Sequence, residues 1–365
     1  MTKTKQNIML TPGPTPLPPE VLAALSRPIL HHRTEAFGEM FQFVLDAMQR
    51  AYMTKNRVLM ASASGTGAME SAVVNLLSPG DEALVYSTGA FGDRFAAILK
   101  AYGLSPVVIS EEWGHAAKAE KISDALKRHP KTKVVFLQHT DTSTGVLNDI
   151  KDLAAAVHAN SQAVIVVDAV SSLAAEEFRM DEWGVDVALT ASQKGLMNAP
   201  GLAFAAISER AWTLVQSARL PKFYFDWKTY DRSLKARETP YTPAVAMVAA
   251  QAEALKLIEK IGLEGMWKRT AELADYTRTW ARKNGLAIFA KDPAHILTGV
   301  RLPEGVDGSA MLAEILREEG ISIADGQLSL KGKIVRIAHM GYISRADLDA
   351  GFVALEKRLA KVQAA

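Results

Sequence analysis

Two ionisable side chains stand just after apolar segments that are typical of buried β-strands. Asp168 follows Ala163–Val167, and Lys194 follows Val185–Thr190 after three uncharged residues. Burial among uncharged neighbours disfavours the ammonium form of a lysine and frees its amine to attack a carbonyl compound. A carboxylate in a poorly solvated site favours the charged form of a cationic partner, such as a protonated ring nitrogen. The 26 positions between the two residues are enough for one crossover, so we expect both to face one cleft.

A loop of small residues, Ala63–Glu70, follows another predicted strand and opens a helix that runs to about Leu77. Its bare backbone N–H groups, at the positive end of a helix, suit a phosphate, and Ser64 and Thr66 add two hydroxyls. The loop is no P-loop, because no Gly-Lys-Ser/Thr follows, and no dinucleotide fingerprint, because Glu70 takes the place of the third glycine.

Each of these three features also has an ordinary structural interpretation. The loop is compatible with a tight strand-to-helix turn, Asp168 with a cap or turn residue, and Lys194 with a solvated loop residue. Ligands collect at the carboxyl ends of parallel strands, however, and all three features are predicted at such ends. Their combination therefore favours a ligand site.

The elements that position these residues read as an α/β fold. Short apolar or β-branched runs alternate with amphipathic stretches through the first two-thirds of the chain, which indicates a large domain with a mostly parallel, seven-stranded sheet. The predicted strands are Arg57–Met60, Ala83–Tyr86, Pro106–Ile109, Val134–Gln138, Ala163–Val167, Val185–Thr190 and Leu202–Ile207. Helices are predicted over Phe37–Met48, whose Met/Phe stripe we interpret as core, and over Ala244–Ile261.

The rest of the chain is predicted to form an arm and a smaller C-terminal α+β domain. The proline-rich segment Leu10–Pro19 cannot form a helix or a central strand and should run extended over another surface. The expected division is an extended arm over 1–20, a large domain over 21–261 and a small domain over 262–365. In the small domain, the predicted elements are strands Ile296–Leu302 and Lys333–Ala338, a helix Met311–Glu319 and a helix after the capping box Ser344–Asp347.

Composition excludes several functional classes. The chain has no cysteine, so disulfides, thiolate metal sites and cysteine nucleophiles are ruled out. Its formal charge of +2 gives no basic field for nucleic acid or an anionic membrane, and its eight histidines show no metal-ligand spacing. No apolar run approaches the roughly 20 residues that span a bilayer, and the polar start lacks a signal, so we expect a cytoplasmic protein without metal, nucleic acid or membrane.

Four motifs closely resemble the class V aminotransferases of pyridoxal 5'-phosphate (PLP) fold type I. They are Ser64-Gly-Thr-Gly67, Ser143-Thr-Gly-Val146, Asp168-Ala-Val170 and Ser192-Gln-Lys-Gly195. Within that class the chain looks most like the alanine/serine–glyoxylate and serine–pyruvate aminotransferases, from the Thr11–Pro14 arm to the Arg336 strand. The resemblance implies a PLP cofactor and transamination between a small amino acid, alanine or serine, and a small 2-oxo acid, glyoxylate or pyruvate.

The resemblance also implies cofactor contacts, carried over by position. Lys194 would be the Schiff-base lysine and proton shuttle, and Asp168 would pair with the pyridine nitrogen. Val170 and Phe91 would lie on the two ring faces, with Phe91 where some relatives carry tryptophan. The residues implied for the phosphate are Ser64, Gly65, Thr66 and Gln193. Thr66 stands where some relatives carry histidine, and its hydroxyl can also donate to phosphate.

Further implied roles concern the substrate and a second subunit. Ser143 would lie near the ring hydroxyl and the substrate carboxylate, Arg336 would grip that carboxylate, and Gly13 would line the substrate pocket. Thr242 would reach the phosphate of the partner subunit, which implies a homodimer with shared active sites. Taken without the resemblance, Arg336 reads more simply as a surface arginine on a strand.

Two other functions remain open from the sequence. On the same fold, a PLP-dependent lyase or decarboxylase is an alternative, whereas a cysteine desulfurase is excluded by the missing cysteine. From a different class, a nucleotide-binding or non-catalytic interaction protein would use the Ser64–Gly67 loop.

Overall fold

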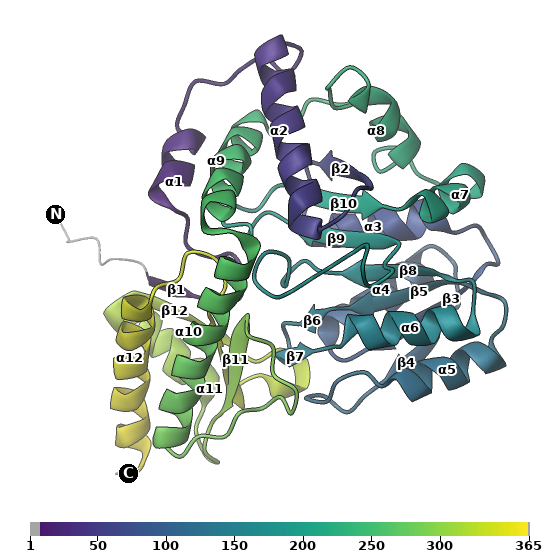
Figure 1. Ribbon diagram of the computed structural model, residues 1–365. Coiled ribbons are helices and arrows are strands. Elements are labelled where there is room, and N and C mark those ends of the chain that lie inside the picture. The colour runs from purple at the N-terminus through teal and green to yellow at the C-terminus, as the bar shows by residue number, and fades with distance from the viewer. Residues whose placement is uncertain (1–7, 364–365) are drawn as a thin grey trace.

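A seven-stranded sheet forms the centre of the larger part of the molecule. The computed structural model describes residues 8–363 (Figure 1). The strand order is β2-β10-β9-β8-β5-β3-β4. The strands are β2 (Arg57–Ala61), β3 (Glu82–Ser87), β4 (Val107–Ser110), β5 (Thr132–Gln138), β8 (Val164–Asp168), β9 (Val187–Ala191) and β10 (Ala203–Ile207). All seven predicted strands are present, and their ends lie within two residues of the predicted ends.

The sheet is mostly parallel, as predicted, and β10 is the exception. The pairs β3–β4, β3–β5, β5–β8 and β8–β9 run parallel, whereas β10 runs antiparallel to both β2 and β9. The link between β9 and β10 contains no helix and is too short for a parallel crossover, which takes a dozen or more residues. The chain therefore turns back at this point.

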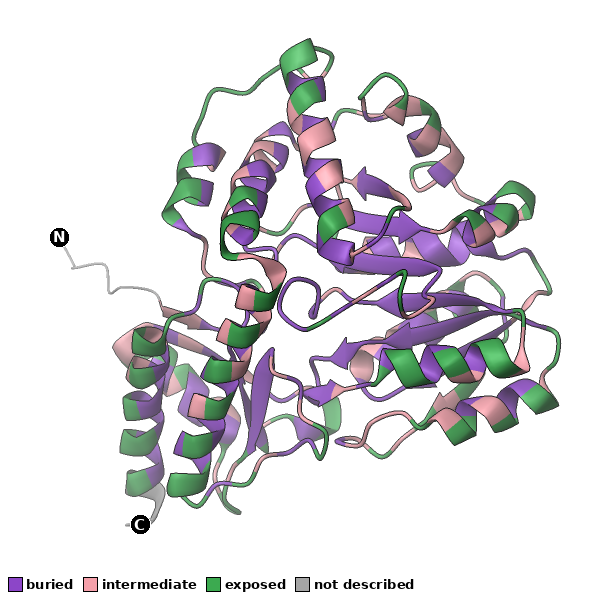
Figure 2. Cartoon of the chain, viewed as in Figure 1, coloured by how far each residue is buried: buried purple, intermediate pink, exposed green. Residues whose placement is uncertain are grey.

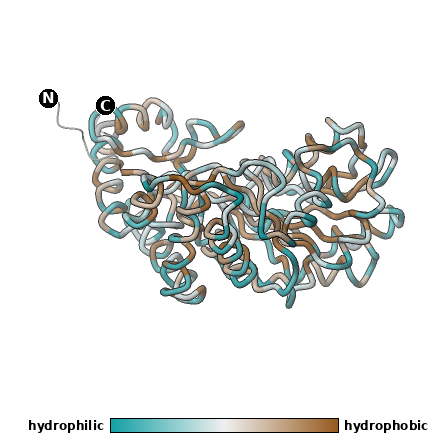
Figure 3. Tube along the Cα trace, turned by 90° about the horizontal axis from the view of Figure 1, so that it is seen from above, coloured by the Kyte–Doolittle hydropathy of each residue, from teal (hydrophilic) through white to brown (hydrophobic). Residues whose placement is uncertain are grey.

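Helices cover both faces of the sheet (Figures 1 and 2). One face packs against α3 (Gly65–Leu76), α4 (Ala90–Ala101), α7 (Glu209–Ser217) and α8 (Trp227–Leu234), and the other against α2 (Glu35–Tyr52), α5 (Ala119–Arg128), α6 (Ile150–Asn160) and α9 (Val245–Ile261). Alternate strand residues divide between the two cores, since Val135 and Leu137 join one and Val134 and Phe136 the other. Figure 3 shows hydrophobic stretches within the molecule and hydrophilic segments mainly around them.

The α2 helix confirms the prediction made from its Met/Phe stripe. Thr34 caps the helix by accepting a hydrogen bond from the Phe37 N–H at 3.4 Å. Phe37, Phe41 and Met48 are buried in the core between the large sheet and the helices α2, α5, α6 and α9. The stripe is therefore core and holds no ligand site.

A second, four-stranded sheet organises the C-terminal part of the chain. Its order is β1-β12-β13-β11, and β1 runs parallel to β12. The strands are β1 (Ile8–Leu10), β11 (Leu297–Arg301), β12 (Ile321–Asp325) and β13 (Ile334–Ala338), and the helices are α10 (Leu263–Lys283), α11 (Gly308–Glu319) and α12 (Arg345–Gln363). The smaller α+β part is as predicted, but β1, β12 and α10 were not foreseen.

The capping box predicted at Ser344–Asp347 is present at the start of α12. The Ser344 hydroxyl accepts from the Asp347 N–H at 3.2 Å, and the Asp347 carboxylate accepts from the Ser344 N–H at 2.8 Å, which is a capping box. Because Leu10 lies in the core of the small sheet, the start of the arm packs with the C-terminal part of the chain. The predicted division between the two domains at residue 261 stays a prediction. The remaining short elements are α1 (Pro19–Leu25), β6 (Thr140–Asp141), β7 (Val146–Leu147) and the 3-10 helix η1 (Leu328–Leu330). No helix within residues 8–363 has the length and apolar character to cross a membrane.

Candidate active site

Asp168 and Lys194 lie in one cavity at the carboxyl ends of two neighbouring strands. Asp168 ends β8, Lys194 follows β9, and these strands pair in parallel. The cavity has a volume of about 220 Å³. Its walls are Gly13, Ser64, Gly65, Thr66, Met69, Phe91, Arg94, Thr140, Asp168, Val170, Ser171, Gln193 and Lys194. The amine and the carboxylate that the sequence singled out therefore face the same space.

Burial changes the proton affinity of both groups. Desolvation lowers the pKa of Lys194 to about 8, although the nearby Asp168 charge opposes the change. Desolvation likewise raises the pKa of Asp168 to about 6, against the hydrogen bond that its carboxylate accepts from the Val170 N–H at 2.8 Å. A lysine with this pKa supplies neutral amine near neutral pH, which a nucleophile for carbonyl chemistry needs.

One end of the cavity is built to hold an anion. Ser64 caps α3 by accepting from the Gly67 N–H at 3.4 Å, so the positive end of this helix opens into the cavity. Arg94 donates to the Thr66 hydroxyl at 3.1 Å and adds a fixed positive charge. Gln193 also lines the cavity, and only its amide N–H groups, not its unpartnered Oε1 atom, can donate to an anion. This is the end where the sequence predicted a phosphate.

Two side chains provide walls for a flat ring. Phe91 and Val170 both line the cavity, and the Arg94 guanidinium stacks 4.6 Å from the centre of the Phe91 ring. The Phe91 N–H donates to the buried Asp141 carboxylate at 3.0 Å, which fixes the start of α4. A Cβ atom on Gly65 would lie 3.0 Å from the Val170 methyl groups, so a larger residue there would require Val170 to shift.

Sequence reasoning missed four residues of this cavity wall, Met69, Arg94, Thr140 and Ser171. Arg94 stands one helical turn after Phe91 on α4, and that spacing was an available signal. Thr140 follows the end of β5 at the same edge of the sheet, and its buried hydroxyl has no partner among the described residues. Buried polar groups are normally paired, and the partner of this hydroxyl is either water or a ligand.

The N-terminal arm lies against the reactive lysine. The Lys194 amine donates to the Pro12 carbonyl oxygen, and the Thr15 N–H donates to the Gln193 carbonyl at 3.2 Å. Gly13 has φ = 102°, and a Cβ atom on it would overlap Cδ and Cε of Lys194. Only glycine fits at this position, so the arm forms part of the cavity wall.

Ser143, Arg336 and Thr242 lie outside this cavity wall. Ser143 is fully buried, and its hydroxyl donates to Asp141 at 2.6 Å and accepts from the Ala90 N–H at 2.9 Å. The reading of Arg336 as a surface arginine is wrong, because the residue is 7% exposed on β13. Its guanidinium donates to the carbonyl oxygen of Thr142 at 2.7 Å, and its charge contributes to the lowered pKa of Lys194. Thr242 is exposed, and its contact with a partner subunit stays a prediction.

Comparison with known proteins decides the family. The model of the family "Aminotransferase class-V" matches residues 8–350. The chain belongs to this family. This class V aminotransferase is 38% identical to the "soluble hydrogenase, small subunit" of Synechococcus, over 97% of the chain and 93% of that relative. It is 33% identical to the L-aspartate–glyoxylate aminotransferase of Paracoccus denitrificans (98% and 92% covered) and 32% identical to a serine–glyoxylate aminotransferase of Methylorubrum extorquens (97% and 91%).

Solved structures confirm the fold of the class V aminotransferase. The alanine–glyoxylate aminotransferase of Nostoc superposes with a TM-score of 0.93 at 30% identity, over 97% of this chain and 96% of that one. The predicted PLP fold type I architecture and the aminotransferase class are thus both confirmed. Enzymes of class V depend on PLP, and no cluster of three or more His, Asp or Glu side chains in residues 8–363 offers a metal site.

Proposed function

We propose that this class V aminotransferase holds PLP through Lys194 and transfers the amino group of alanine or serine to glyoxylate or pyruvate. One observation carries the proposal: a buried amine and a buried carboxylate share a cavity whose other end is a helix N-terminus with an added arginine. The aldehyde, the pyridine nitrogen and the phosphate of PLP each have a partner in this arrangement. The cofactor would supply an aldehyde that bonds to an amine and a cationic ring that accepts electrons.

Each wall of the cavity would hold one part of the cofactor. Asp168, kept close to the ring nitrogen, would hold a proton there, because its negative charge in a desolvated site favours the cationic partner. Phe91 and Val170 would contact the two faces of the ring. The residues that would hold the phosphate are Ser64, Gly65, Thr66 and Gln193, to which the structure adds Arg94. The unpartnered Thr140 hydroxyl is free to donate to a ring substituent.

Lys194 would carry out the proton transfers. When it is not bonded to the cofactor, the Lys194 amine would be free to act as a base. Its Nζ atom would accept the proton from the α-carbon of the amino donor and later return it. The lowered pKa of Lys194 suits both steps, since the amine is able to accept and to return a proton near neutral pH.

Arg336 and Ser143 are proposed to orient the carboxylate of the amino donor. The Arg336 guanidinium already reaches the segment after β6, where it contacts the Thr142 carbonyl. Ser143 is one residue further along, and its hydroxyl would have to exchange its present bond to Asp141 for a substrate contact. The planar fork of an arginine is suited to a carboxylate because it donates two parallel hydrogen bonds.

An Arg336→Lys substitution is expected to lower kcat/KM for the amino donor by about 10- to 100-fold, because charged hydrogen bonds in this setting contribute about 1.5–3 kcal/mol. Most of the change should appear in KM. Initial rates over a range of donor concentrations measure it, with Arg317→Lys on the exposed face of α11 as the control. An unchanged KM would show that Arg336 does not bind the donor.

The rate at which the cofactor-free enzyme takes up PLP is expected to rise with pH through about 8. Burial depresses the Lys194 pKa from 10.5 to about 8, and only the neutral amine attacks the aldehyde. The rate should thus be low at pH 6.5 and level off above about pH 9. Stopped-flow absorbance after mixing with PLP gives this profile. A rate that continues to climb towards pH 10.5 would contradict the lowered pKa.

A homodimer with shared active sites is part of the proposal. Thr242 would reach the phosphate of the partner subunit, and it is exposed. The residue before it, Tyr241, belongs to a group of aromatic side chains near the surface. Phe223 is 79% exposed and packs 5.8 Å from Tyr241, and Tyr224 stacks 5.2 Å from the same ring. Exposed apolar patches of this kind favour contact with another protein. A cytoplasmic location stays a prediction.

Donor half-reactions test the proposed function and separate it from a lyase or decarboxylase. Alanine or serine alone should convert the bound aldehyde into the amine form, with one 2-oxo acid released per active site. Glyoxylate or pyruvate should then restore the aldehyde. A lyase or decarboxylase would return to the aldehyde form without an acceptor, and that result would overturn the proposal. Adding aspartate and 2-oxoglutarate to the panel identifies the preferred donor and acceptor.

The hydrogenase name of one relative does not extend to this chain. Nickel–iron and iron–sulfur centres are held by cysteine thiolates, and the chain has no cysteine. The cavity residues instead match what PLP requires.

A further inference from the structure

A buried carboxylate, that of Asp141, lies next to the cavity that holds Lys194 without lining it. Asp141 ends the short strand β6 and is 0% exposed. Its Oδ1 atom accepts from the Ser143 N–H at 3.0 Å and from the Ser143 hydroxyl at 2.6 Å. Its Oδ2 atom accepts from the N–H groups of Phe91 and Gly92 at 3.0 and 3.3 Å. Each oxygen thus binds a different segment of the chain.

These hydrogen bonds cap the start of α4 from another part of the chain. The residue at the N-cap position of α4 is Gly89, which has no side chain to offer. The first N–H of the helix, that of Ala90, donates to the Ser143 hydroxyl at 2.9 Å, and the next two donate to Asp141. A Cβ atom on Gly89 would lie 2.5 Å from Cγ of Asp141 and from Oγ of Ser143. The glycine therefore makes room for the two side chains that complete the helix start.

The first turn of α4 also provides part of the cavity wall. Phe91 and Arg94 both line the cavity. The Arg94 guanidinium lies 4.6 Å from the centre of the Phe91 ring and donates to the Thr66 hydroxyl at 3.1 Å. Residues three positions apart lie on one face of a helix, so the place of both side chains depends on where the helix begins. A shift of the helix start would move the ring wall and the anion-binding end together.

The charge of Asp141 suits its place at the start of α4. The N-terminus of a helix carries a partial positive charge, which stabilises an anion nearby. Burial raises the pKa of the Asp141 carboxyl, although its hydrogen bonds to Ser143, Gly92 and Phe91 oppose the rise. Because each oxygen already accepts from two donors, a proton on either oxygen would displace a donor. Loss of the side chain would leave the two helix N–H groups without an acceptor.

We propose that Asp141 is a positioning residue of the cofactor site, which sets Phe91 and Arg94 in place by holding the first turn of α4. Asp141 acts through these two side chains and contacts neither the cofactor nor the substrate. The proposal rests on the PLP site proposed above and adds a residue on which the affinity for PLP depends. A carboxylate that served the fold alone would support stability without changing PLP binding.

Hydrogen–deuterium exchange of the cofactor-free enzyme and titration with PLP test the proposal together. In Asp141→Ala, the amides of residues 90–92 should exchange at least about 10-fold faster than in the unchanged enzyme, because two of them lose their acceptor. The apparent dissociation constant of PLP, measured by absorbance, should rise about 10-fold. Ser143→Ala keeps the Asp141 charge but removes the acceptor of the Ala90 N–H. It should also speed exchange there, and should weaken PLP binding by about 2- to 5-fold.

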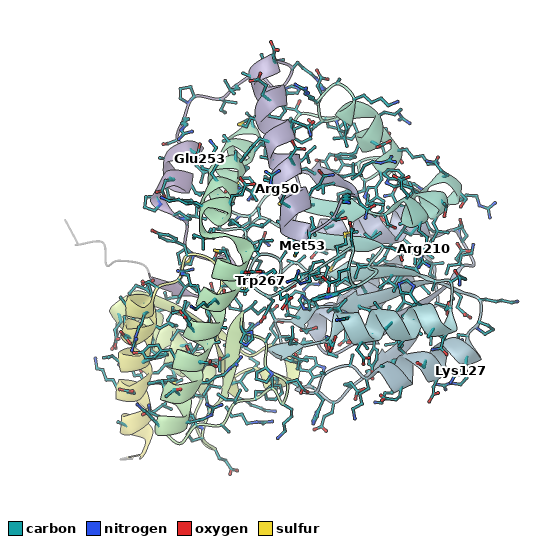
Figure 4. All side chains as sticks on the ribbon, viewed as in Figure 1. Arg50, Met53, Lys127, Arg210, Glu253 and Trp267 are labelled. Atoms are coloured by element: carbon teal, nitrogen blue, oxygen red, sulfur yellow. The ribbon has the colours of Figure 1, made fainter. Side chains whose placement is uncertain are left out.

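Asp186→Ala is the matched control, because the Asp186 carboxylate is also buried and also accepts four hydrogen bonds. Asp186 comes just before β9, whereas Lys194 follows this strand, so the control lies at the opposite end of the sheet. Its ion-pair partner Arg210 is labelled at the right of Figure 4. Asp186→Ala should lower the melting temperature but leave PLP affinity and the exchange of residues 90–92 unchanged.

The outcomes separate this proposal from the proposed function. Thermal melting identifies a variant that fails to fold, and Ser143→Ala decides if Asp141→Ala is one. Unchanged exchange, faster exchange with unchanged PLP affinity, or an equal loss of PLP affinity in Asp186→Ala would each overturn the proposal. An unchanged enzyme that binds no PLP would overturn the proposed function as well, whereas failure of the present proposal alone leaves PLP binding by the unchanged enzyme intact.

Discussion

Lys194→Ala is expected to lower kcat by at least about 10⁴-fold, because it removes both the nucleophile and the group that moves the proton. The residue is buried and lines the same cavity as Asp168 and Gly13. Among the described residues, Lys194 is the one lysine on the wall of this cavity, and the other basic side chain there is Arg94. An arginine cannot replace it, since a guanidinium stays protonated. Steady-state rates with alanine and glyoxylate measure the loss.

Chemical rescue makes the Lys194 result specific. A small primary amine such as methylamine should restore part of the rate in Lys194→Ala, because it can occupy the emptied space and accept a proton there. Lys127, labelled at the lower right of Figure 4, has a side chain that is 66% exposed and does not line the Lys194 cavity, so Lys127→Ala should leave the rate unchanged. A Lys194→Ala enzyme that keeps more than a tenth of its activity would refute the proposed role.

Asp168→Asn is expected to lower kcat by about 10²–10³-fold, the usual effect of removing one group that stabilises charge in a transition state. Burial raises the Asp168 pKa to about 6, but a cationic ring nitrogen beside it would keep the carboxylate ionised. An amide has the same shape but no charge, and so cannot favour the protonated ring. The loss should appear in kcat more than in KM for the donor.

Two further variants separate the charge of Asp168 from its place in the fold. Asp168→Glu keeps the charge and should retain more activity than Asp168→Asn. Asp124→Asn, at an exposed position on α5, should behave like the unchanged enzyme. Equal activity of Asp168→Asn and the unchanged enzyme would show that no ring charge depends on this carboxylate.

Local sequence signals predicted most of the large sheet and the heart of the site. Apolar runs that are buried on both faces are distinctive, so β8 and β9 were found together with the residues at their carboxyl ends, Asp168 and Lys194. The loop Ser64–Gly67 was found because small residues at a helix start leave backbone groups bare. These features depend on short stretches of chain, which a sequence displays directly.

Features that depend on distant contacts were harder to predict. The strand β1 pairs with β12, more than 300 positions away. β1 has only three residues, and β12 is only partly buried, so neither shows the continuous apolar run of the large-sheet strands. In the segment after β5, the sequence pointed to Ser143, whereas Thr140 lines the cavity that holds Lys194. Which side chain of such a segment faces the cavity depends on turns that spacing does not reveal.

Borohydride reduction of the PLP-loaded enzyme, followed by digestion and peptide mapping, tests the central claim most directly. Reduction makes the bond between the cofactor and its lysine permanent, so the modified peptide identifies the attachment site. The cofactor is expected on the peptide that contains Ser192-Gln193-Lys194-Gly195 and on no other. A label on a different lysine, or no label at all in an active enzyme, would contradict the account.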